Sequence, residues 1–319
     1  LIHLENEYNN FKVVVFIDSS LTNITSTNKR LVVRLSTTFQ KLKLFSKKLD
    51  TAIYFGNLPP LVRSSNSIIY FHNHYLVLDF QSLLNQSWQF LLKYSLQQLY
   101  IKIFLKNVDK VACQTMRIKK EFSIKYNYQN VEVLPFYSSC PKPKEFIEKI
   151  YDFCYISLAR PHKNHDLLFD SLEILGKKGF SLSIVVTIEH LYEELLARIN
   201  NINNLYNIKI INVGLIPKED VCKIYYQTKC LIYPSIYETL GLALIEAVDA
   251  GLDVIAADLK YTHEVISTPF LFDHQSVTSC ANVIEEYLEN KNLNKCKGLI
   301  DNKVDDLINL FTGIGNVQK

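Results

Sequence analysis

The sequence predicts an α/β protein made of two doubly wound, Rossmann-like domains that face a cleft. The chain has 319 residues, the length of about two domains of roughly 150 residues each. Compact apolar runs of about four to eight residues alternate with segments of helical spacing. Because a helix follows most runs, the strands should lie parallel in sheets that are covered on both faces.

The first half of the chain shows this alternation in a less regular form. Strands are predicted at 11–18, 51–57, 67–73, 108–115 and 131–136. Helices are expected near 38–49, 80–105 and 115–125.

The second half alternates more regularly. Strands are predicted at 153–159, 180–188, 207–216, 229–237, 252–259 and 270–273. Helices are predicted at 165–179, 189–202, 218–228, 241–251 and 276–290. Ligands of such sheets bind beyond the carboxyl ends of the strands, so the strand-to-helix turns are the places to search for a site.

The segment 137–146 has two prolines and no clear periodicity, which favours a boundary there. We therefore expect domains at 1–145 and 146–319, and we leave open that the last helix packs back onto the first domain. The first residue is Leu1 and the only methionine is Met116. Residues 1–11 look like a helix, and the family resemblance described below implies that a strand and a loop should come before it, so we expect that strand to be missing from the sequence.

Charge is spread unevenly along the chain. Residues 1–150 hold 20 Lys and Arg against 10 Asp and Glu, and residues 151–319 hold 15 against 22, which gives +10 and −7. The basic half should face an anionic partner, and a membrane surface, a phosphorylated lipid or a nucleic acid would each fit. No recognised nucleic-acid-binding motif supports the last of these.

Seven cysteines form no C-x-x-C pair, and no secretory signal precedes them. This pattern predicts reduced thiols in a cytosol, with core packing as their ordinary role. No apolar run approaches the ~18 residues that span a bilayer. We therefore expect a cytoplasmic protein, and we leave open that it is held at the inner face of the membrane.

The stretch "YPSIYETLGLALIEAVDAGLDVIAADL" carries two glutamates at the seam between a strand and a helix. The helix should begin near Gly241, so the amides of Gly241 and Leu242 would favour a phosphate. Carboxylates such as Glu238 and Glu246 can accept paired hydrogen bonds from the vicinal hydroxyls of a sugar. The alternative is that both are ordinary charges of a surface helix.

This stretch resembles the nucleotide-binding segment of the retaining glycosyltransferases of family 4 (glycosyl transferases group 1), which have the GT-B fold. The family pattern is P-S-x-x-E-G-F-G-L-x-x-x-E-A-x-A-x-G-x-P-V-I-A, followed later by E-V-I. The matching residues are Pro234, Ser235, Glu238, Gly241, Leu242, Glu246, Ala247, Ala250, Gly251, Val254, Ile255, Ala256 and Glu264. Thr239 stands in place of a glycine and Asp253 in place of a proline, and Thr239 could stiffen the loop beside the donor sugar.

The resemblance implies transfer of a sugar from a nucleotide diphosphate sugar, with retention, to a saccharide or lipid-linked acceptor in cell-envelope polysaccharide synthesis. It implies that Glu238 orients the sugar and Glu246 holds the ribose. Arg160 and Lys163, in the turn "LARPHKNH", would contact the donor phosphates together with the amides of residues 241 and 242. Gly214 and Leu215 would lie beside the nucleobase.

In the first half, "FHNHYL" places His72 at the end of a strand, where it could contact the acceptor or the developing charge of the leaving group. The alternative is an ordinary loop histidine. The H-x-H pair of His72 and His74 has no third ligand, and the chain has no D-x-D, so neither a metal nor another cofactor is expected.

Residues 88–106 form a long apolar helix with three lysines, and residues 41–48 add four more lysines. Such a helix could lie in a membrane interface, or it could be a core helix with snorkelling lysines. The runner-up to an enzyme is a GT-B module that binds nucleotide sugars or anionic glycans without turnover.

Overall fold

A computed structural model describes residues 14–18, 31–35, 38–49, 51–84, 87–289 and 296–312. These residues form two compact units, Leu1–Leu134 with Lys303–Lys319, and Pro135–Asn302. The helix expected over residues 1–11, and the opening strand expected to be missing, lie outside the described residues.

The boundary falls earlier in the chain than the predicted one at 145/146. The segment after Pro135 belongs to the second unit because hydrogen bonds join it to other residues of that unit. The Tyr137 hydroxyl donates to the Ile300 carbonyl at 3.2 Å, and the Lys149 ammonium donates to the Gly251 carbonyl at 3.0 Å. The two prolines of 137–146 therefore lie inside the second unit and do not mark its edge.

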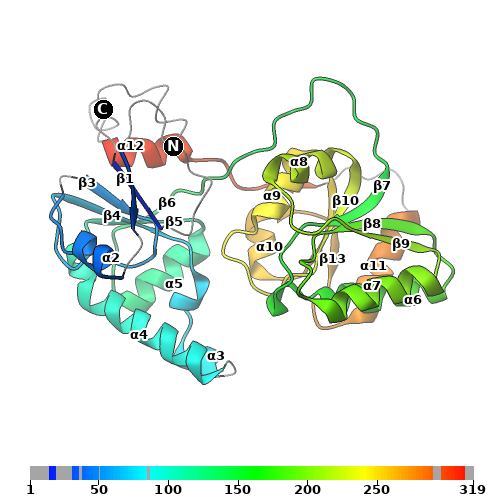
Figure 1. Cartoon of the computed structure of the whole chain (residues 1–319), viewed down its shortest axis with the longest axis horizontal. Helices are drawn as coiled ribbons and strands as arrows, with labels where there is room; N and C mark the ends of the chain where they lie inside the picture. Colours follow the sequence, from blue (N-terminus) through cyan, green and yellow to red (C-terminus); the bar gives the residue numbers. More distant parts are fainter. Residues whose placement is uncertain are drawn as a thin grey trace. The chain divides into compact units, whose positions relative to one another are not determined.

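The first unit is built on a parallel sheet with the strand order β3-β4-β5-β6. The strands are β3 (Thr51–Tyr54), β4 (Asn66–Phe71), β5 (Lys110–Cys113) and β6 (Val131–Val133). Helices α4 (Trp88–Phe104) and α5 (Met116–Tyr126) lie on one face, and α12 (Val304–Thr312) lies on the other, in contact with β3 (Figure 1). Residues 68–71 of β4 are all apolar because this part of the inner strand is buried on both faces.

The remaining elements of this unit are a second, two-stranded parallel sheet and several short helices. They are β1 (Val14–Asp18), β2 (Leu31–Leu35), α2 (Thr38–Phe45), α3 (Phe80–Leu84) and the 3-10 helices η1 (His74–Leu76) and η2 (Leu105–Asn107). Strand β2 was not predicted. The single helix expected near 80–105 was wrong, because Ser87 caps a new helix by accepting from the Phe90 amide at 3.4 Å.

The second unit is a six-stranded sheet with the order β13-β11-β10-β7-β8-β9, and all its strands are parallel. The strands are β7 (Tyr151–Tyr155), β8 (Leu182–Val186), β9 (Ile208–Asn212), β10 (Thr228–Tyr233), β11 (Asp253–Ala257) and β13 (Phe270–Phe272). The chain runs outward from β7 to β9 and then returns to place β10 on the other side of β7. The topological switch point of the sheet is therefore between β7 and β10.

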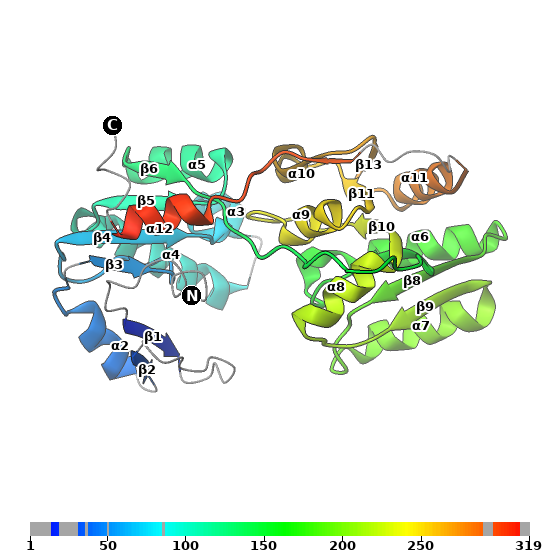
Figure 2. The same ribbon diagram turned by 90° about the horizontal axis from the view of Figure 1, so that it is seen from above.

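Helices cover both faces of this sheet, as Figures 1 and 2 show. One face carries α6 (His165–Lys177), α7 (Glu193–Leu205) and α11 (Val277–Glu289), and the other carries α8 (Lys218–Tyr226) and α9 (Leu242–Asp249). The smaller elements are η3 (Pro161–Lys163), α10 (Lys260–Val265) and an antiparallel pair of β12 (Ile266–Ser267) and β14 (Lys297–Gly298). The α/β class and the doubly wound character predicted for this half are confirmed.

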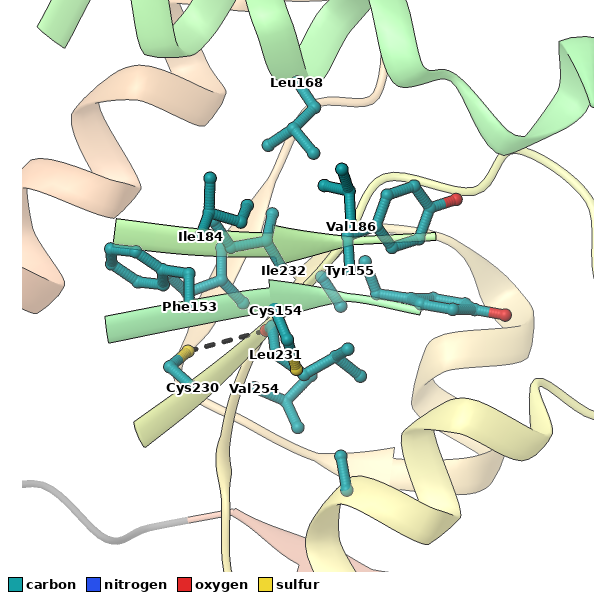
Figure 3. Close-up of a cluster of buried hydrophobic side chains, with 14 of the residues drawn as sticks. Phe153, Cys154, Tyr155, Leu168, Ile184, Val186, Cys230, Leu231, Ile232 and Val254 are labelled. Carbon is teal, nitrogen blue, oxygen red and sulfur yellow. Dashed lines mark hydrogen bonds between the residues drawn. The ribbon is translucent and has the colours of Figure 1, made fainter. Parts of the chain in front are cut away.

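The core of the second unit lies between the central strands and these helices. Figure 3 shows side chains of β7, β8 and β10 gathered with Leu168 of α6. Phe153, Cys154 and Tyr155 are successive residues of β7, and all three are fully buried. Such a run on a parallel strand is apolar on both faces, which is why the sequence pattern was readable here.

Two of the seven cysteines are joined. Cys140, in the segment before β7, forms a disulfide with Cys222 of α8 across 82 residues of sequence. The prediction of reduced thiols was therefore wrong for this pair, because a spacing without C-x-x-C says nothing about residues that the fold brings together. The other five are free, and Cys113, Cys154 and Cys230 are among the buried ones.

Candidate active site

The candidate site lies at the carboxyl ends of β7 and β10, the two strands at the switch point. After β7 the chain passes through η3, where Pro161 fixes the first helical φ angle and Asn164 adopts a left-handed φ of 56°. This short turn presents Lys163. After β10 the chain passes through the loop that carries Ser235 and Glu238 and then enters α9.

These two loops meet in an ion pair. The Lys163 ammonium lies 2.5 Å from Oε1 of Glu238, and the two side chains are only 17% and 14% exposed. The same oxygen accepts from the Tyr233 hydroxyl at 2.7 Å and from the Ser235 hydroxyl at 2.7 Å. One carboxylate oxygen thus has three donors, which fixes its position and satisfies its charge away from bulk water.

Three buried tyrosines support the loops that carry Lys163 and Glu238. The Tyr155 hydroxyl donates to the Lys163 carbonyl at 2.6 Å, and the Tyr261 hydroxyl donates to the Ser235 carbonyl at 2.5 Å. The ring of Tyr233 makes edge contacts with both, at centroid distances of 5.9 and 6.4 Å. Burial raises the pKa of all three phenols, so they stay protonated donors at neutral pH.

The second glutamate of the motif has a similar support. Glu246, on α9, forms an ion pair with Lys218, the first residue of α8, and its side chain is 13% exposed. Tyr225 lies seven residues after Lys218, on the same face of α8, and is fully buried. Burial, and next the charge of Glu246, raise the pKa of Tyr225. Each glutamate of the pair is therefore held by one lysine and one buried tyrosine.

The start of α9 is shaped for close backbone approach. Gly241 caps the helix with a left-handed φ of 71°, and a Cβ there would meet the Leu244 side chain at 3.2 Å. Leu242 is the first helical residue, so its amide is among those without an intrahelical acceptor. The predicted phosphate-binding amides are thus at a helix N-terminus, as expected.

The other predicted donor residues lie at neighbouring strand ends. Arg160 is exposed, and its guanidinium donates to the Tyr192 hydroxyl at 2.7 Å, so it does not join the pair of Lys163 and Glu238. Gly214 follows β9 with a φ of 65°, and the next residue, Leu215, is 74% exposed. An exposed apolar side chain at this edge could pack on a planar ring.

In the first unit, His72 follows β4 and is paired with Asn57. The His72 amide donates to Asn57 Oδ1 at 2.7 Å, so the Asn57 amide nitrogen is the group that lies 3.3 Å from His72 Nε2. Nε2 therefore accepts, and the proton of the neutral ring is assigned to Nδ1. Burial lowers the pKa of His72, which favours this neutral form.

His74 belongs to a different cluster. Its Nδ1 lies 3.1 Å from the Arg117 guanidinium and 3.6 Å from the Glu121 carboxylate. Across the described part of the chain, no three His, Cys, Asp or Glu side chains gather as a metal site would require.

Sequence reasoning missed Tyr233, Tyr225 and Lys218 as parts of the site. Tyr233 lay in a predicted strand, and Tyr225 and Lys218 lay in a predicted helix, with nothing in either element to mark them as site residues. Only the spacing of Lys218 and Tyr225 at i and i+7, which puts them on one helix face, was available as a signal.

Comparisons with known proteins identify the family and the fold of this chain. The family described as Glycosyl transferases group 1 matches residues 141–304, about half of the chain. A tRNA-queuosine alpha-mannosyltransferase of Drosophila melanogaster is 23% identical over 77% of this chain and 70% of its own length. The O-antigen chain mannosyltransferase RfbU of Salmonella typhimurium is 23% identical over 58% of this chain and 54% of its own length.

Among solved structures, TarM superposes with a TM-score of 0.55 at 17% identity and is matched over 77% of this chain and half of its own length. This likeness shows a shared fold, the GT-B class of two Rossmann-like domains. The chain belongs to the glycosyl transferases group 1 family.

Proposed function

We propose that this chain transfers a sugar from a nucleotide diphosphate sugar to a saccharide or lipid-linked acceptor, with retention at the anomeric carbon. The observation that carries the proposal is the pair of lysine-supported glutamates, Glu238 with Lys163 and Glu246 with Lys218, beside the N-terminus of α9. A sugar nucleotide has two sets of hydroxyls and a diphosphate between them, and this site offers carboxylates, cations and free amides in one place.

In the reaction, the bond between the anomeric carbon and the diphosphate breaks, and the acceptor oxygen bonds to that carbon on the same face. The acceptor proton passes to the departing phosphate oxygen, so no side-chain nucleophile is needed. Negative charge grows on the diphosphate as it leaves. Lys163, Arg160 and the amides at Gly241 and Leu242 stabilise that charge, which lowers the barrier because the interactions are strongest in the transition state.

The remaining groups orient the donor and the acceptor. Glu238, fixed by its donors, holds the hydroxyls of the transferred sugar, and Glu246 holds the ribose. Leu215, with the backbone of Gly214, packs beside the nucleobase. His72, as a neutral ring, contacts the acceptor or the leaving group.

The acceptor proposal rests on the relatives and on charge. Both relatives described above carry the name of a mannosyltransferase, so mannose is the first sugar to test. Their named contexts differ, one being tRNA-queuosine and the other the O-antigen chain. We place this chain with the second, in cell-envelope polysaccharide synthesis in the cytoplasm, and we expect it to need neither a metal nor another cofactor. Among the described residues, no helix is both long enough and apolar enough to cross a membrane.

The test is donor-dependent release of free nucleoside diphosphate from uridine-, guanosine- and adenosine-linked sugars. The variants Lys163→Ala and Glu246→Ala should lose this release while they keep the far-UV circular dichroism of the parent. Lys178→Ala is a matched control, because it also removes one lysine from an ion pair, with Glu285, but lies between the end of α6 and the start of β8, away from the carboxyl ends of the strands. A folded parent that releases nothing from any donor, but binds one of them, would instead support the non-catalytic module.

A further inference from the structure

Helix α4 of the first unit has two apolar faces, and only one of them is covered. Tyr94 and Ile101 are buried in the unit's core. On the outward side, five large apolar side chains are between 49% and 70% exposed: Trp88, Leu92, Leu96, Leu99 and Ile103. Their spacing of four, four, three and four residues places them in one row along the helix.

A row of this kind is uncommon on a soluble surface. Single exposed apolar residues are ordinary, but a contiguous apolar patch marks an interaction site. The neighbouring helix α3, which contacts α4, adds Phe80 at 57% and Leu84 at 52% exposure. The exposed apolar surface therefore extends past the start of α4.

The charges within the segment that carries this row have one sign. Residues 80–108 contain three lysines and no Asp or Glu, and Lys93, Lys102 and Lys106 are all exposed. At about 100° per residue the row is roughly 80° wide, and Lys93 and Lys102 fall on opposite sides of it. The outward face is thus an apolar strip with cationic margins.

We propose that this face, Trp88, Leu92, Leu96, Leu99 and Ile103 with the three lysines, docks on an anionic lipid membrane. Apolar side chains would enter the boundary between headgroups and acyl chains, and the lysines would reach the anionic headgroups. Trp88 at the end of the row suits the interface because its ring is amphipathic. A two-fold dimer through this face would set these lysines against their copies, and residues 80–108 hold no Asp or Glu to pair with them, so a second copy fits less well.

This inference goes beyond the proposed transfer reaction and does not depend on it, since vesicle binding is measured without donor or acceptor. If both hold, docking would bring the protein to acceptors carried on lipid. Failure of one leaves the other standing.

The test uses the intact chain and its single tryptophan, which lies in the proposed face. Vesicles of phosphatidylcholine with phosphatidylglycerol should shift Trp88 emission to the blue and sediment the protein, and phosphatidylcholine alone should do both much more weakly. The triple variant Lys93→Gln, Lys102→Gln and Lys106→Gln should bind about a hundredfold more weakly, because each lysine near an anionic surface contributes roughly fivefold. The control is a matching triple change at exposed lysines of the second unit: Lys142→Gln, Lys144→Gln and Lys177→Gln.

A second set of variants tests the apolar row. Leu92→Ser, Leu96→Ser and Leu99→Ser together should abolish sedimentation, whereas the same change at three exposed leucines of the second unit, Leu191, Leu205 and Leu299, should not. The proposal is overturned if Trp88 emission does not shift when anionic vesicles are added. It is also overturned if that emission shifts with protein concentration alone while light scattering shows dimers, since a second copy would then cover the face.

Discussion

The substitution Tyr233→Phe removes one hydroxyl oxygen and should lower the free energy of unfolding by an amount that depends on the charge of Glu238. The Tyr233 hydroxyl donates to Glu238 Oε1 at 2.7 Å, and both groups are largely shielded from water. A hydrogen bond to a charged group contributes about 1.5–3 kcal/mol, against about 0.5–1.5 kcal/mol for a neutral pair. Tyr233→Phe leaves no cavity, and Lys163 and Ser235 still donate to the same oxygen. We therefore expect a loss of about 1.5–2 kcal/mol in the free energy of unfolding.

The assay is urea unfolding at neutral pH, followed by circular dichroism and arranged as a double-mutant cycle. Tyr233→Phe in a Glu238→Gln background should cost less than in the parent, about 0.5–1.5 kcal/mol, because the charged acceptor is gone. Tyr226→Phe is the control, since that hydroxyl donates to the neutral carbonyl of Cys140 at 3.2 Å and should cost about 0.5 kcal/mol. Equal losses from Tyr233→Phe in both backgrounds would refute the reasoning.

Three further perturbations test other parts of the fold. Burial lowers the pKa of His165 to about 4, below about 6.5 in an unfolded chain. The unfolded state then binds the proton first, so stability present above pH 6.5 should fall by up to about 3 kcal/mol as the pH drops towards 4, and His165→Phe should flatten that slope in urea titrations. Reduction should cost about 2–5 kcal/mol through loss of the disulfide between Cys140 and Cys222, seen as a dithiothreitol-dependent fall in melting temperature that is absent from the double alanine variant. Gly241→Ala should destabilise more than the roughly 1–2 kcal/mol of Gly214→Ala, because both have positive φ but only the first Cβ meets a leucine side chain, at 3.2 Å; equal melting temperatures would contradict this.

The part of the fold that was predictable from sequence is the part with long apolar runs. Residues 153–155 of β7 and 230–233 of β10 are buried on both faces of the sheet, so these runs are apolar and the alternation with helices is clear. Strand β2 was missed because its apolar run is interrupted by Arg34 and follows a polar segment rich in Asn, Ser and Thr. The local sequence pattern predicts a strand well where the strand is fully buried, and poorly where the strand is short.

The candidate site divides in the same way. Glu238 and Glu246 could be found because they lie in one continuous stretch with a recognisable pattern. Lys163 was predicted as a phosphate contact, but its pairing with Glu238 could not be predicted, because the two residues are 75 positions apart along the chain and are brought together only by the pairing of β7 with β10. The disulfide was invisible for the same reason, and Tyr233 was read as one more apolar residue of its strand.

The two glutamates and their lysines have a consequence for the order of events on the protein. Each carboxylate is paired with an ammonium, so the two negative charges are balanced at the place where we propose that a diphosphate binds. An arriving donor must exchange those internal pairings for its own hydroxyls and phosphates. All four groups lie within residues 135–302, so this exchange of partners takes place within one unit. Calorimetry could measure its energetics.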